Sequence, residues 1–135
     1  MVSSIDFIVP GVPVPKARPR LGKNGAYTPD KTRLYERKGA YHAREAMAGN
    51  PPVSCSVFVD LDIFMPIPES FGKLKREKAL EGIVRPIGKI DVDNVAKAIL
   101  DHMNKIVYID DNQVCELSAS MFYGDNPRVQ VRVSW

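Results

Sequence analysis

The hydrophobic and polar positions of the chain change period several times, and each period predicts an element. Apolar residues at every second position from Val53 to Met65 predict a strand with one buried face. Apolar residues three and four apart between Ile90 and Asn104 predict an amphipathic helix that starts near Asp91. A second helix is predicted from Thr28-Pro29 to Met47, before the helix-ending run Gly49-Asn50-Pro51-Pro52.

Shorter elements complete the pattern. We expect short strands at Ile5–Val9 and Val107–Ile109, a basic helix at Lys73–Leu80, and a hairpin formed by Gln113–Tyr123 and Arg128–Trp135. Four prolines between Pro10 and Arg20 predict an extended loop there, followed by a turn at Lys23-Asn24-Gly25. The order of elements predicts one compact α+β domain over residues 1–135, with a mostly antiparallel (mixed) sheet packed with two to three helices.

Composition narrows the class of protein. The chain has 135 residues, of which 44% are hydrophobic and 26% are charged, as in an ordinary globular domain. It has no run of about 18 apolar residues and no signal peptide at Met1, so we expect a cytoplasmic protein of a bacterial cell with no membrane partner. Cys55 and Cys115 lie in strand-like runs without a CxxC partner, which favours two buried, reduced thiols.

Charge is divided unevenly along the chain. Eight basic residues and two acids lie between Lys16 and Lys38, whereas seven acids and two lysines lie between Asp91 and Asp125. This division suits an enzyme that binds a polyanion and also a cation. Two solvated faces of opposite charge would give the same composition.

The acidic half contains the candidate chemistry. Asp91 and Asp93 lie at a predicted helix N-terminus, where negative charge is favoured, and Lys97 shares a helix face with Asp93. If the strand before Asp110 and Asp111 returns beside the helix start, three or four carboxylates converge, and such a group needs a cation, typically Mg²⁺. The same residues also fit a helix cap, a surface ion pair and a turn.

Longer motifs distinguish these alternatives. The segment DVDNVAKAILDHMN, from Asp91, and the later VYIDDNQV resemble the signature of RusA-type Holliday junction resolvases. That signature is Asp-x-Asp-Asn, a Lys three residues after the Asn, an Ala-rich helix with a downstream Asp, and then Asp-Asp-x-Gln about one helix and turn later. The N-terminal PVPKARPR and Tyr27-Thr28-Pro29 are similar to the phage and Gram-positive branch of that family. Ile90 departs from it, since many members have Pro there.

The resemblance implies a magnesium-dependent endonuclease, with Mn²⁺ as a possible substitute, that cuts four-way DNA junctions as a homodimer with two active sites. It assigns catalysis to Asp91, Asp93, Lys97 and Asp111, and metal binding to the three acids. Asp110 is adjacent and unassigned.

On this interpretation seven basic residues are candidate phosphate contacts: Lys16, Arg18, Arg20, Lys73, Lys75, Arg76 and Lys89. Charge that serves only solubility is the alternative for them. Asp60 and Asp62 are expected on a solvated sheet face, and Val129, Val131, Val133 and Trp135 in the core or a dimer interface. An inactive DNA-binding module and a phage assembly protein are the alternative functions.

Overall fold

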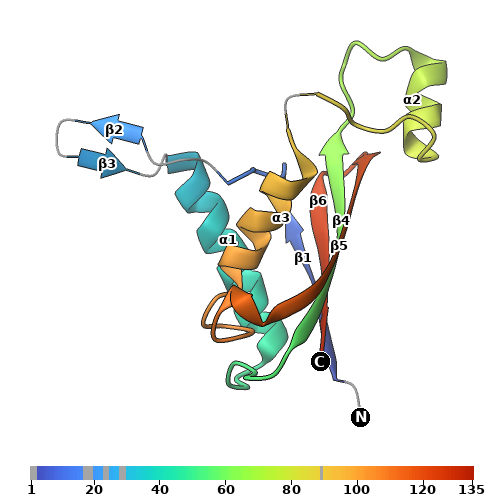
Figure 1. Ribbon diagram of the computed structural model, residues 1–135. Helices are drawn as coiled ribbons and strands as arrows, with labels where there is room; N and C mark the ends of the chain where they lie inside the picture. The colour runs from blue at the N-terminus through green and yellow to red at the C-terminus, as the bar shows by residue number, and fades with distance from the viewer. Residues whose placement is uncertain (1–2, 17–19, 23–24, 28–29, 89) are drawn as a thin grey trace.

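A four-stranded sheet forms the centre of the protein in the computed structural model, which describes residues 3–16, 20–22, 25–27, 30–88 and 90–135. Its strand order is β1-β6-β4-β5, with bounds β1 Ser4–Pro10, β6 Arg128–Ser134, β4 Val57–Pro66 and β5 Val114–Gly124. β6 pairs antiparallel with both β1 and β4, and β4 pairs parallel with β5 (Figure 1). The predicted α+β class with a mostly antiparallel, mixed sheet is therefore confirmed.

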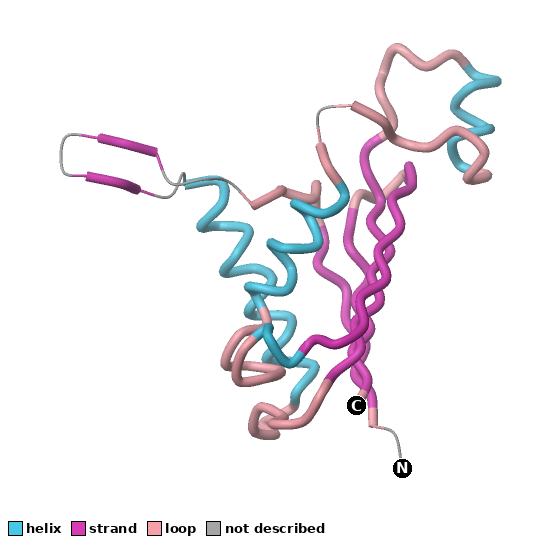
Figure 2. Tube along the Cα trace, viewed as in Figure 1, coloured by secondary structure: helices cyan, strands magenta, loops and turns pink. Residues whose placement is uncertain are grey.

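The helices α1 (Asp30–Met47) and α3 (Val92–His102) cover one face of the sheet, as Figure 1 shows. The helix α2 (Lys73–Leu80) lies beyond one end of the sheet, near β5. A separate hairpin of β2 (Arg20–Gly22) and β3 (Gly25–Tyr27) extends from the body beside α1 (Figure 2). Its strands were not predicted, and the turn predicted at Lys23-Asn24-Gly25 falls partly on residues 23–24, which lie outside the described residues. None of the helices in the described ranges is long and apolar enough to cross a membrane.

The core lies between the sheet and the two helices. Five alternate residues of β4 are buried: Val57, Val59, Leu61, Ile63 and Met65. The residues between them, including Asp60 and Asp62, fall on the opposite face, which none of the described helices covers. The valines of β6 are buried in the same core. Of the two alternatives that the sequence allowed for them, core or dimer interface, the structure shows the core.

The predicted hairpin of the last two strands is wrong. β5 and β6 are both present, but β4 lies between them and pairs with each. The connection from Asp125 to Pro127 therefore passes over the end of β4, across about 10 Å, which three extended residues can span. β4 has an apolar residue at every second position, and all of these residues are buried, which favours a central place in the sheet.

Two further predictions need correction near the start of β4. The strand begins at Val57, and Val53 makes only an isolated bridge to Tyr108, so Val107–Ile109 is not a full strand either. Cys55 and Cys115 are exposed, not buried. Cys55 lies before β4 begins, and Cys115 lies on β5, an edge strand with no second partner strand among the described residues.

Candidate active site

The start of α3 presents the first two predicted catalytic acids. Asp91 is the N-cap residue, with extended backbone angles, and Asp93 lies in the first turn. The Asp91 side chain makes no capping hydrogen bond; it accepts one from the side-chain amide of Asn94 at 3.4 Å. The Asp93 carboxylate accepts a hydrogen bond from the Asn94 backbone N–H at 3.0 Å. Both carboxylates are exposed, and we call them the N-terminal acidic pair.

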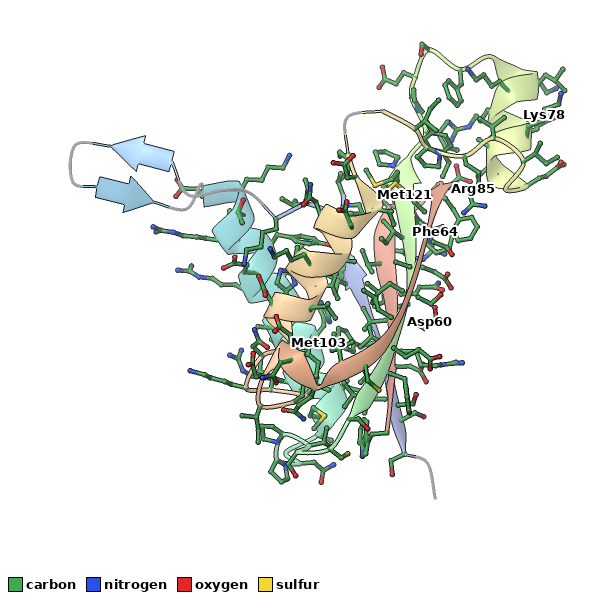
Figure 3. The ribbon with its side chains drawn as sticks, viewed as in Figure 1. Asp60, Phe64, Lys78, Arg85, Met103 and Met121 are labelled. Atoms are coloured by element: carbon green, nitrogen blue, oxygen red, sulfur yellow. The ribbon has the colours of Figure 1, made fainter. Side chains whose placement is uncertain are left out.

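An open groove of about 650 Å³ runs beside this pair. Its other walls are the loop after α2, which contributes Arg85 and Ile87, and the adjoining part of β5, with Ser120 and Met121. The groove therefore has the N-terminal acidic pair, an arginine and a half-buried part of β5 in its walls. Figure 3 shows Arg85 and Met121 near the same end of the sheet.

A second acidic group lies at the other end of α3. Asp111 adjoins Asp101, the last acid of the helix, and Asp110; we call these three residues the C-terminal acidic cluster. Burial raises the pKa of Asp111, and so do a hydrogen bond with Asp101 and the charge of Asp110. Carboxylates this close repel one another until a proton or a cation joins them.

Lys16 also reaches this end of α3. Its ammonium forms an ion pair with Asp101, and its backbone N–H donates to the Asn94 carbonyl at 3.0 Å. The segment from the N-terminal loop is thereby fixed along α3. The charge of Lys16 faces a carboxylate, whereas the sequence predicts a phosphate contact for it.

Gln113 fixes the turn that carries Asp110 and Asp111. Its side-chain oxygen accepts hydrogen bonds from the backbone N–H groups of Ile109 and Asp110, at 2.9 and 3.0 Å. Its amide nitrogen donates to the carbonyls of Val53 and Cys55, at 2.8 and 2.9 Å. Four hydrogen bonds from one side chain thus join the acidic turn to the segment that precedes β4.

The assignment from sequence gave no role to two residues of the site, although the family signature includes an acid and a Gln at these places. Asp101 lies four residues after Lys97 and eight after Asp93, so it shares their side of the helix, and this spacing was available as a signal. Gln113 lies three residues after Asp110, which is the spacing of a capping box. Its hydrogen bonds to Val53 and Cys55 had no signal in the sequence.

The two acidic groups are far apart within one chain. A helix rises about 1.5 Å per residue, so Asp93 and Asp101 are separated by about 12 Å along α3, with Lys97 halfway between them. Ligand oxygens lie only about 2.1 Å from a magnesium ion. The predicted ligand set of Asp91, Asp93 and Asp111 is thus not brought together in one chain. Over the described ranges no three His, Cys, Asp or Glu residues are placed to hold a metal ion.

The predicted phosphate contacts fall in three places. Lys73, Lys75 and Arg76 are exposed on α2. The Lys75 ammonium lies 4.1 Å from the centre of the Phe71 ring, and a guanidinium nitrogen of Arg76 lies 2.7 Å from the Asp125 carboxylate. Arg18, Lys89 and the side chain of Arg20 lie outside the described residues.

Comparison with known proteins defines the class. Residues 10–134 match the family described as Endodeoxyribonuclease RusA, and the chain belongs to this family of DNA-cutting enzymes. The resemblance predicted from the sequence motifs is therefore confirmed. One relative is a protein of Bacillus subtilis (strain 168) described as Uncharacterized protein YqaN. It is 37% identical over 137 residues, which is 96% of this chain and 94% of the relative.

Proposed function

We propose that this protein is a divalent-metal-dependent endonuclease that cuts branched DNA, with four-way junctions as its main substrate. Family membership supports the nuclease class, and one observation of the structure supports the site: an exposed helix face carries Asp93 and Lys97, and Asp93 lines an open groove. A bound magnesium ion would position the attacking water and stabilise charge at the scissile phosphate.

The place of each candidate catalytic residue, on α3 or beside its ends, suits a role in the reaction. Lys97 lies between the two acidic groups, so its ammonium can neutralise charge on a phosphate placed between them. Asp91 and Asp93 present carboxylate oxygens at the groove, without a lysine or arginine within ion-pair distance among the described residues. Burial first, and then the neighbouring carboxylates of Asp101 and Asp110, raise the pKa of Asp111, and a bound cation would offset the repulsion among these carboxylates.

We further propose that the active unit is a homodimer in which both acidic groups contribute to each metal site. One chain keeps them about 12 Å apart, which is too far for a shared ion. In a twofold dimer the N-terminal acidic pair of one subunit can adjoin Asp111 of the partner subunit, and symmetry repeats the arrangement. Two such sites would also provide the paired cuts that resolution of a junction requires.

Cleavage of defined DNA tests this function. The protein is incubated with a labelled four-way junction and with a linear duplex of the same arm sequences, each with and without Mg²⁺. We expect paired nicks in the junction only when Mg²⁺ is present, and little cutting of the duplex. Binding to the junction without cutting would favour an inactive DNA-binding module, and neither binding nor cutting would favour an assembly protein.

A further inference from the structure

On the open face of the sheet, two stacked phenylalanines lie in a row between two arginines. Strand register places Arg128 of β6 beside Phe64 of β4, and Phe64 beside Phe122 of β5. The two rings stack with centres 5.4 Å apart and planes 25° apart. The Arg128 guanidinium lies 3.9 Å from the centre of the Phe64 ring, and the Arg85 guanidinium lies 4.1 Å from that of Phe122.

Backbone carbonyls hold both guanidinium groups in place. Arg85 donates to the Met121 carbonyl at 2.7 Å, and Arg128 donates to the Asn126 carbonyl at 2.8 Å. Among the described residues neither arginine forms an ion pair with a carboxylate. Their positive charges are therefore oriented but not neutralised, and this is the state that favours an anionic partner.

A second row of the same sheet face provides a contrast. Arg132 of β6 pairs across the strands with Asp6 of β1 and Asp60 of β4. Its guanidinium lies 2.8 Å from the Asp6 carboxylate, and Asp60 and Asp62 raise its pKa further. This arginine is already neutralised by its neighbours. The unneutralised charge on the face belongs to the row of Arg85 and Arg128.

The position of Arg85 connects this row with the candidate active site. Arg85 lines the groove that Asp91 and Asp93 also line, and it lies against Phe122 on the open face of the sheet. Figure 3 shows Arg85 and Phe64 at the end of the sheet nearest α2, with Asp60 farther along β4. A strand of DNA in the groove would therefore pass from the acidic pair to Arg85 and then to Arg128.

We propose that Arg85 and Arg128, supported by the rings of Phe122 and Phe64, bind phosphates of the DNA strand that leaves the groove. The proposal rests on the proposed function, since it takes branched DNA as the ligand. Guanidinium groups suit phosphate because their donors form a planar fork, and a ring beneath them limits their freedom before DNA binds. The phenylalanines are positioning residues, and the arginines make the contact.

Salt dependence of binding tests the proposal. Dissociation constants for a fluorescent four-way junction are measured in EDTA, without cleavage, over a range of salt concentrations. Each phosphate contact adds about 0.9 to the steepness of log K against log salt on duplex DNA. We expect Arg85→Gln and Arg128→Gln each to weaken binding and to flatten the slope by about 1, and the double variant by about 2.

Arg132→Gln is the matched control, because it removes an arginine from the same face whose charge is already neutralised. It should leave the slope and the affinity unchanged. Phe122→Leu should weaken binding with a nearly unchanged slope, because the charge of Arg85 remains, and Phe122→Tyr should restore the affinity because it restores the ring. Thermal melting of each variant confirms that it is folded.

The outcomes separate this inference from the proposed function. A double variant that keeps the wild-type slope, or an Arg132→Gln variant that loses as much slope, would overturn the proposed contact even if the wild type cuts junctions. A wild type that binds through these arginines, with the expected slopes, but never cuts with Mg²⁺ would support the contact and overturn the endonuclease. A wild type that does not bind the junction would overturn both.

Discussion

The buried histidine of α3 makes stability depend on pH in a way that can be calculated. His102 packs against the Tyr35 ring, with centres 5.3 Å apart, and close to Gly39 of α1. Both ring nitrogens are buried and have no hydrogen-bond partner among the described residues. Burial is the largest cause that lowers the pKa of His102 from 6.5 to about 4; the charge of Asp101 opposes it and that of Lys16 adds to it.

The sign follows from proton binding. Between pH 6.5 and about 4 the unfolded chain carries a proton on this histidine that the folded chain does not, so acid favours unfolding. The stabilisation is complete above pH 6.5 and is lost as the pH falls towards 4. At about 1.4 kcal/mol for each pH unit, the full effect is about 3 kcal/mol, of which about 2 kcal/mol is lost between pH 7.5 and 5.0. The total free energy of unfolding of a small domain is only about 5–15 kcal/mol, so this loss is a large part of it.

Urea unfolding at pH 7.5 and 5.0 measures this loss. The wild type should lose about 2 kcal/mol more than His102→Leu, whose apolar side chain does not titrate. The difference between the losses of unfolding free energy of the two proteins excludes the contributions of the carboxylates, because both proteins contain them. His42→Gln is the control and should behave like the wild type, because it leaves His102 in place. Equal pH dependence in the wild type and His102→Leu would refute the reasoning.

Three further predictions concern other residues. Lys97→Ala should lower the cleavage rate by a factor of about 100 or more at saturating enzyme, with junction binding nearly intact; recovery of the full rate at higher Mg²⁺ would instead indicate a metal-binding role. Gln113→Ala should lower both the melting temperature and the cleavage rate, since it releases four hydrogen bonds around the turn of Asp111, and an unchanged rate would show that this turn does not position the carboxylate. Gly39→Ala should cost about 1–3 kcal/mol in urea unfolding, because its methyl group would collide with the His102 ring, and wild-type stability would contradict that packing.

Local patterns in the sequence predicted the elements better than their partners. The helix bounds at Lys73–Leu80 match α2, and α3 starts directly after Asp91, because apolar spacing and capping are local. The pairing of β5 was missed because alternation shows that a strand exists but not which strand lies beside it. The central place of β4 depends on competition among all strands for the core, which no single segment records.

The candidate site shows the same limit. The interpretation of the sequence requires the segment after α3 to return to the N-terminus of this helix. In the structure the segment lies at the C-terminus of α3 instead. Lys105 donates its backbone N–H to the Tyr108 carbonyl at 2.7 Å, so this segment forms a tight turn and does not extend back along the helix. The buried Tyr108 hydroxyl then donates to the Leu100 carbonyl at 2.6 Å and fixes Asp110 and Asp111 near Asp101. These contacts are tertiary, and residue spacing does not reveal them.

Dimerisation is the first requirement of the proposed composite site. A mass measurement in solution should give twice the 15.0 kDa of the chain, free or bound to a junction. A monomer under both conditions would remove the second source of carboxylates and the basis for paired cutting.

Subunit mixing tests most directly whether the two acidic groups form one active site. Asp93→Asn and Asp111→Asn are each made, and each alone should bind a four-way junction but fail to cut it with Mg²⁺. When the two variants are coexpressed with different tags and the mixed dimer is purified, one of its two composite sites contains both an intact Asp93 and an intact Asp111. The account predicts that this mixed dimer nicks one strand of the junction. A mixed dimer as inactive as its parents, or a single variant that cuts at the wild-type rate, would contradict it.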